Sequence, residues 1–216
     1  MIITKRVIVT LPLLIFLLFI CAPSDNAFWE VFTARVDLSK KIRFDLEEQV
    51  RINNDYSNVN NLISEAALSY ELTKQIKAKS SFRYYYNPGS FNRFRYTVDL
   101  AYEYSKKGFP LNLQYRGRFQ HTVEQYTRDF SNYIRNKFSA EYKLSKLVDP
   151  YFAYESYFRL NYVNRFTVNR YYAGLTWRVS NNIDFETFFL YESEFGERNP
   201  NSSKIIGLNL IVDLEF

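Results

Sequence analysis

The segment that decides the fold is IIGLNLIVDLEF, residues 205–216. Its apolar side chains alternate from Ile206 to Phe216, and Asn209, Asp213 and Glu215 occupy positions between them. A period of two residues predicts a β-strand with one apolar face and one polar face. The rest of the chain can be compared with this pattern.

The same alternation recurs along the chain. Each patterned run is about 10 to 13 residues long, roughly double the usual strand of a soluble protein. A tilted strand that crosses a bilayer needs about 9 to 11 residues. The sequence therefore predicts eleven membrane-crossing strands, at 29–38, 42–52, 62–72, 76–86, 91–104, 111–121, 133–144, 151–161, 168–179, 183–193 and 205–216.

Tight turns such as Ser39-Lys40-Lys41 alternate with longer polar segments at 53–61, 122–132 and 194–204. Barrels of the bacterial outer membrane have short periplasmic turns, longer external loops and an even number of strands. The final strand should therefore descend to the periplasm. Two explanations of the odd count stay open: ten strands from Ile42 close the barrel while 29–38 is partial or lies in the lumen, or a twelfth strand is missed.

The predicted fold is all-β, a closed antiparallel up-and-down transmembrane β-barrel of about 10–12 strands, formed by a single domain over 28–216. A soluble lipocalin-like barrel, apolar inside, would show the same alternation. Tyr and Trp near strand ends, as at Tyr102 and Trp177, favour an apolar face toward lipid. Arg mixed with Asp and Glu on the polar face and an aromatic residue at the end of the last strand favour it as well. The expected insertion signal is Leu210, Val212, Leu214 and Phe216.

The N-terminus has the features of a secretory signal peptide, residues 1–27. Lys5 and Arg6 precede an apolar run, and cleavage is expected after Ser24 or Ala27. The one cysteine of the chain, Cys21, lies in this leader, so disulfides and thiol catalysis are not expected in the exported protein. The predicted location is the bacterial outer membrane.

Several short motifs resemble a known family. They are the Arg-containing strand at 133–138 (YIRNKF), PYFAYE at 150–155, NRYYAGL at 169–175 and the last strand ending in Phe216. On these motifs the chain is identified as a member of the domain of unknown function 2490 family, predicted outer-membrane β-barrels. The resemblance implies a fold and a location, and it brings no catalytic residues.

The charge pattern predicts the contents of the lumen. The net charge of +5 is spread singly over alternate positions, unlike the basic stripe of a nucleic-acid-binding protein. We expect basic side chains in the external half, at Arg51, Arg83, Arg93, Arg95, Arg116, Arg118, Arg135, Lys137, Arg159 and Arg170. We expect acidic partners in the middle and periplasmic parts, chiefly Asp45, Glu47, Asp99, Glu103, Glu141, Glu155, Asp184 and Glu186.

Three functions fit this pattern. The first is a structural or interaction barrel with a lumen largely filled by salt-bridged side chains. The second is a porin-like narrow channel or binding vestibule for anionic small solutes or glycolipid phosphates. The third is a lipid-modifying enzyme that uses the one histidine, His121. No convincing catalytic constellation, metal site or cofactor site is visible, so a non-enzymatic protein is expected. Its expected partners are outer-membrane lipid, lipopolysaccharide and the barrel-assembly machinery.

Overall fold

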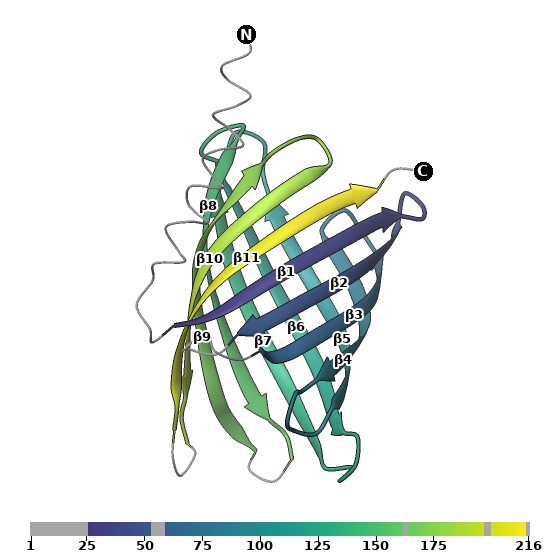
Figure 1. Ribbon diagram of the computed structural model, residues 1–216. Helices are drawn as coiled ribbons and strands as arrows, with labels where there is room; N and C mark the ends of the chain where they lie inside the picture. The colour runs from purple at the N-terminus through teal and green to yellow at the C-terminus, as the bar shows by residue number, and fades with distance from the viewer. Residues whose placement is uncertain (1–25, 53–58, 162–163, 197–199, 215–216) are drawn as a thin grey trace.

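The computed structural model describes residues 26–52, 59–161, 164–196 and 200–214, and these form eleven strands in one closed barrel (Figure 1). The predicted all-β barrel is thereby confirmed, with strand ends shifted by a few residues. The strands are β1 (Asn26–Asp37), β2 (Ile42–Ile52), β3 (Val59–Glu71), β4 (Ile76–Tyr86), β5 (Arg93–Ser105), β6 (Leu111–Glu124), β7 (Phe130–Tyr142), β8 (Val148–Arg159), β9 (Arg165–Arg178), β10 (Ile183–Glu194) and β11 (Ser202–Leu214).

The first strand closes the barrel. β1 pairs antiparallel with β2 and parallel with β11, in a register that runs from Asn26 opposite Lys204 to Val36 opposite Leu214. Hairpins reverse the chain at every step, so the first and last of eleven strands run in the same direction and can pair only in parallel. Closure with ten strands and closure with twelve are therefore both wrong, and 29–38 belongs to a full strand of the wall. A closed wall leaves no sheet edge with unpaired backbone groups.

The two ends of the barrel differ in their connections (Figure 1). The β1–β2, β3–β4, β5–β6, β7–β8 and β9–β10 turns lie at one end, here called the short-turn end, together with the last residues of β1 and β11. The other five connections lie at the opposite, long-loop end. The contrast in length is smaller than the sequence suggests because strands extend into the predicted loops. Thr122–Glu124, for example, belong to β6.

The wall is apolar outside and charged inside. Leu46, Val98 and Phe138 point outward and are 51%, 60% and 54% exposed, whereas Asp99 and Glu155 point inward and are 3% and 1% exposed. A lipocalin-like barrel would show the reverse, so that alternative is excluded. An exposed apolar face of this extent is suited to lipid.

Aromatic residues border the apolar face. Tyr102, Tyr104 and Tyr142 are exposed near the short-turn end, and the Trp177 indole Nε1 donates a hydrogen bond to Thr187 Oγ1 at 3.4 Å. Such rings belong at the level of lipid headgroups. One departure from the apolar pattern is Glu48, which is exposed on the outer face and accepts a hydrogen bond from Ser64 Oγ.

Several predictions fall on residues that the structure does not describe. The signal peptide lies there except for Asn26 and Ala27, which belong to β1. Phe216 lies there as well, whereas Leu210 and Leu214 of the insertion signal are exposed on the outer face of β11. Within the described ranges, no helix is long and apolar enough to cross a membrane.

Parallel closure can be tested by a cross-link. Ala34 and Val212 are direct partners across the β1–β11 pair, and neighbouring strands lie about 4.8 Å apart, within reach of a disulfide. We expect Ala34→Cys combined with Val212→Cys, in a Cys21→Ser background, to form an intramolecular disulfide that gel mobility reveals. The control, Ala34→Cys with Leu208→Cys, separates the thiols by about four residues, or about 13 Å, along the strand. A bond in the control and none in the matched pair would disprove the register.

Candidate functional site

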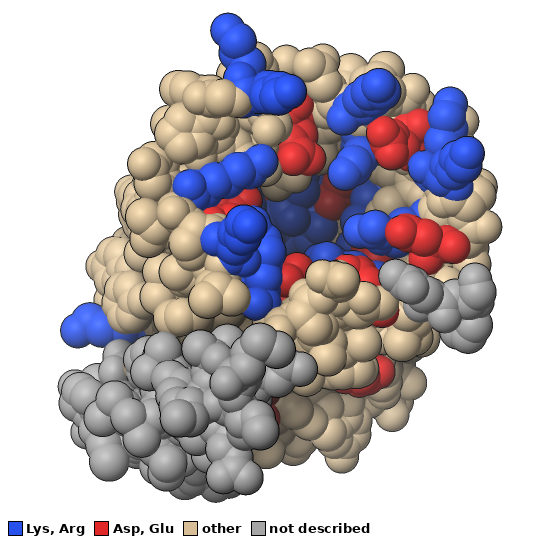
Figure 2. Space-filling model, turned by 90° about the horizontal axis from the view of Figure 1, so that it is seen from above, with Lys and Arg blue, Asp and Glu red and all other residues tan. Residues whose placement is uncertain are grey.

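The side chains inside the barrel are the candidate site. The ten predicted basic residues all occupy alternate positions on the face that also carries the buried acids, so the structure places them in the lumen. Seen from the short-turn end, basic and acidic side chains meet in the central opening (Figure 2). Those of these charges that are buried have lost their hydration and need a partner.

Glu155 is the centre of one ion-pair group. It is 1% exposed. Its carboxylate accepts hydrogen bonds from Arg135 at 2.8 and 2.9 Å, from Arg116 at 2.8 Å and from the Tyr172 hydroxyl at 3.4 Å. Arg135 also donates to Gln120 Oε1 at 2.9 Å. The group joins β6, β7, β8 and β9 across the inner wall.

Arg118 and Asp99 form a second pair, isolated in the sense that neither makes another ion pair with a described residue. The guanidinium donates two bonds, Nε to Oδ1 at 2.7 Å and Nη2 to Oδ2 at 2.6 Å. The two residues are opposite one another in the β5–β6 register. This bidentate geometry is the strongest that a side-chain ion pair can adopt.

A third group lies beside β2, β3 and β4. Arg83 donates to Glu47 Oε1 at 2.9 Å and also pairs with Glu65. Lys79 pairs with Asp45 at 2.8 Å. Five of the predicted acids therefore form ion pairs: Asp45, Glu47, Asp99, Glu103 and Glu155.

Five predicted acids form no ion pair, within the described part of the chain, with the ten predicted basic residues, here called the basic cluster. Glu141, Asp184 and Glu186 form no ion pair with its members, and Asp45 and Glu103 pair with lysines outside it. Glu186 instead accepts a hydrogen bond from Asn209 at 3.2 Å. Glu103 pairs at 3.8 Å with Lys77, outside the cluster.

Three acids were missed as partners. Glu65 and Glu192 lie directly opposite Arg83 and Arg170 in their strand pairs, and each forms an ion pair with that arginine. Asp149 is fully buried and pairs with Arg178 near the short-turn end. Alternation put Glu65 and Glu192 on the inner face, but only the register identifies their partners, and Asp149 precedes the predicted strand 151–161.

A layer of stacked rings and guanidinium groups crosses the lumen. Arg51 lies 3.9 Å from the ring centroid of Trp29 and 6.0 Å from that of Tyr85. Arg170 lies 5.7 Å from Trp29 and 4.9 Å from Tyr157. Arg95 and Arg135 extend the contacts to both sides, at 4.6 Å from Tyr85 and 4.3 Å from Tyr157. We call this set the stacked layer: Trp29, Arg51, Tyr85, Arg95, Arg135, Tyr157 and Arg170.

Apolar side chains fill the space next to the stacked layer. Ala27, Leu190 and Ile205 form a buried cluster, against which Trp29, Tyr172 and Phe188 pack. The Phe188 ring lies directly over Gly207, where an added Cβ would be 2.0 Å from the ring. Gly207 is therefore required because a larger residue would collide with the ring that fills the lumen.

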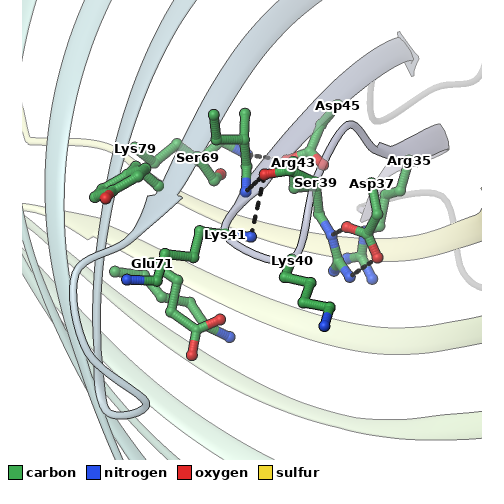
Figure 3. A pocket seen from close by; sticks show the side chains of 13 residues that line it. Arg35, Asp37, Ser39, Lys40, Lys41, Arg43, Asp45, Ser69, Glu71 and Lys79 are labelled. Carbon is green, nitrogen blue, oxygen red and sulfur yellow. Dashed lines mark hydrogen bonds and ion pairs between the residues drawn. The ribbon is translucent and has the colours of Figure 1, made fainter.

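The short-turn end is hollow instead. A cavity of about 520 Å³ opens there between β1, β2, β3 and β4 (Figure 3). Arg43 and Asp37 pair in its wall at 2.7 Å. The basic lining residues outnumber the acidic ones, since the charged lining consists of Arg35, Lys40, Lys41, Arg43, Lys77 and Lys79 with Asp37, Asp45 and Glu71. The sequence predicted chiefly acidic side chains in this half, and the basic excess of this cavity comes from lysines of the β1–β2 turn and of β4.

His121 does not face the lumen. It lies on the outer face of β6, with its ring centroid 6.4 Å from that of Tyr96 and 5.9 Å from that of Phe130. Its Nδ1 is 2.6 Å from Asn132 Oδ1. Among the described residues, no group of His, Cys, Asp and Glu could hold a metal ion.

These features define a class of protein: a closed β-barrel with a lipid-suited outer face and a lumen of buried salt bridges. Residues 26–203 match the family of proteins of unknown function DUF2490, and the chain belongs to that family. The search of curated proteins found no match. Among solved structures the chain is similar to the NanC porin, with a TM-score of 0.54 and 13% sequence identity over 84% of this chain and 91% of that one. The likeness shows the porin-type barrel fold.

The isolated pair gives a test of the buried charges. Arg118→Met leaves the Asp99 carboxylate buried without a partner, which should lower the free energy of unfolding by about 3–5 kcal/mol. The double variant Arg118→Met, Asp99→Leu removes both charges and should recover most of that loss. Denaturant unfolding of the refolded protein measures both changes. As a control, Arg43→Met breaks an exposed pair and should cost about 0–1 kcal/mol. Equal losses of unfolding free energy in Arg118→Met and Arg43→Met would contradict the assignment of Arg118 and Asp99 as a buried ion pair.

Proposed function

We propose that the protein is an outer-membrane barrel with its short-turn end in the periplasm. The exposed apolar face, its aromatic borders and the porin-type fold support this location. The predicted signal peptide, the contact with lipid and lipopolysaccharide and the use of the barrel-assembly machinery belong to the same proposal.

Within that location, the protein acts as a structural or interaction barrel with a filled lumen. The observation that carries this conclusion is the stacked layer. Its contacts run from Tyr85 through Arg51, Trp29 and Arg170 to Tyr157, and thus from β4 to β8 by way of β1. Aromatic rings and guanidinium groups in contact across the lumen leave little room for hydrated solutes. A barrel of this size encloses an interior that side chains can fill.

Bilayer recordings test the filled lumen. The refolded protein should give no stable ohmic conductance, whereas Trp29→Ala combined with Tyr157→Ala removes two rings of the layer and should produce discrete openings. Trp177→Ala, on the outer face, is the matched control and should remain silent. Stable openings of the unchanged protein would refute the filled lumen and support the narrow channel instead.

We also propose that the protein is not an enzyme. His121 is flanked by two aromatic rings on the outer face, and in the described part of the chain its one hydrogen-bond partner is Asn132. A histidine base needs a nucleophile or a water within reach and an acid that orients it.

His121→Ala tests this second part of the proposal. The variant should fold normally and leave any release of fatty acid from phospholipid or lipopolysaccharide at the level of the unchanged protein. The comparison uses Asn132→Ala as a control for the local loss of the hydrogen bond. Hydrolysis that is present in the unchanged protein and absent from His121→Ala alone would establish an enzyme.

A further inference from the structure

Four guanidinium groups surround one buried tyrosine in the long-loop half of the lumen. The guanidinium carbons (Cζ) lie 6.0, 5.9, 5.8 and 4.6 Å from the ring centroid of Tyr85 in Arg51, Arg83, Arg93 and Arg95, respectively. Tyr85 is 3% exposed. Four guanidinium groups of like charge therefore lie around one aromatic ring.

Carboxylates neutralise only one of these four arginines. Arg83 pairs with Glu47 and Glu65. Arg51 donates to the Gln49 amide oxygen at 3.1 Å, and Arg95 Nε donates to the Thr122 hydroxyl at 3.1 Å. Among the described residues, no Asp or Glu forms an ion pair with Arg51, Arg93 or Arg95. The polar partners of Arg51 and Arg95 are neutral. Arg93 lies opposite Glu124 in the β5–β6 register but forms no ion pair with it, so none of the three arginines has a carboxylate in contact within the described residues.

One buried donor also has no partner. Arg51 Nε is out of contact with water and makes no hydrogen bond within the described structure. A buried donor without an acceptor loses the free energy of its hydration and gains nothing in return. A bound anion beside Arg51 would supply both a hydrogen-bond acceptor for its Nε and a negative charge for the neighbouring arginines.

The strand register forces the arginines together. Arg83 and Arg95 are direct partners across the β4–β5 pair, and Arg93 is the partner of Tyr85 itself. Like charges in opposed positions destabilise a sheet. Stacking on Tyr85 and Trp29 holds the guanidinium groups in place but does not cancel their charge. An anion between them would cancel it.

We propose that Arg51, Arg93 and Arg95 bind one oxyanion of the phosphate type in the long-loop half of the lumen. Planar guanidinium groups present paired N–H donors that match the oxygens of such an anion. All three side chains retain some exposure, so the anion can enter from the long-loop mouth. The group could be carried by a free phosphorylated solute or by the phosphorylated headgroup of a glycolipid. The site lies on one side of the lumen wall and exists whether or not the barrel conducts.

Trp29 provides the measurement. Arg51 lies 3.9 Å from its ring, so an anion that draws Arg51 away changes the indole fluorescence. The other tryptophan, Trp177, is replaced in a Trp177→Phe background. Inorganic phosphate and pyrophosphate are titrated into the refolded protein in neutral detergent, against sodium chloride at equal ionic strength. A saturable change with the phosphates that chloride does not reproduce is the expected result.

Variants separate the site from general electrostatics. Arg93→Gln with Arg95→Gln keeps the Arg51–Trp29 reporter and should weaken binding about tenfold or more, since two charged hydrogen-bonding groups are lost. Arg43→Gln with Arg178→Gln removes the same charge at the short-turn end, where both arginines pair with acids, and should leave binding unchanged. Folding is verified by the gel mobility of unheated samples. An equal loss in both double variants, or no saturable response in the unchanged protein, overturns the proposal.

A second titration distinguishes the two sources of phosphate. Micelles that contain lipopolysaccharide are compared with micelles that contain its dephosphorylated form. A response to inorganic phosphate but to neither micelle assigns the site to a solute. A stronger response to the phosphorylated micelle than to inorganic phosphate assigns it to a lipid headgroup. Equal responses to the two lipopolysaccharide forms, without a response to inorganic phosphate, overturn the proposal.

Discussion

Parallel pairing of β1 with β11 is the constraint on which the remaining structure depends. A chain of hairpins with an odd number of strands cannot close in any other way, and an open edge in a bilayer would leave backbone donors and acceptors without partners. Closure makes β1 part of the wall. It thereby brings Trp29 into the lumen, between Arg51 from one side and Arg170 from the other.

The lumen shows two ways to hold a buried guanidinium group. Arg118 and Arg135 each meet a carboxylate through Nε and Nη2 in bidentate geometry, which compensates for part of the lost hydration. Arg51 and Arg95 lie against aromatic rings and donate only to neutral groups. Rings attract a cation without cancelling its charge, so the second arrangement leaves a positive potential that the first does not.

The two mouths of the barrel consequently differ. The short-turn mouth opens into a cavity whose charged walls are partly paired (Figure 3). The long-loop half is filled by rings and carries Arg51, Arg93 and Arg95, which form no ion pair with a described carboxylate. The lumen can be filled and still attract anions. The arginines that fill it carry the positive charge, and they retain some exposure toward the long-loop mouth.

The sequence by itself determined the strands, the two faces and the inward arginines, because a period of two residues follows directly from strand geometry. The family resemblance rested on the same residues. The sequence did not determine how the barrel closes, since alternation within a strand carries no information about which strands are neighbours. It also left Glu65 and Glu192 without partners and gave no role to Trp29. Only the tertiary structure decided these points, because pairing depends on register between strands, and register is a property of the closed barrel as a whole.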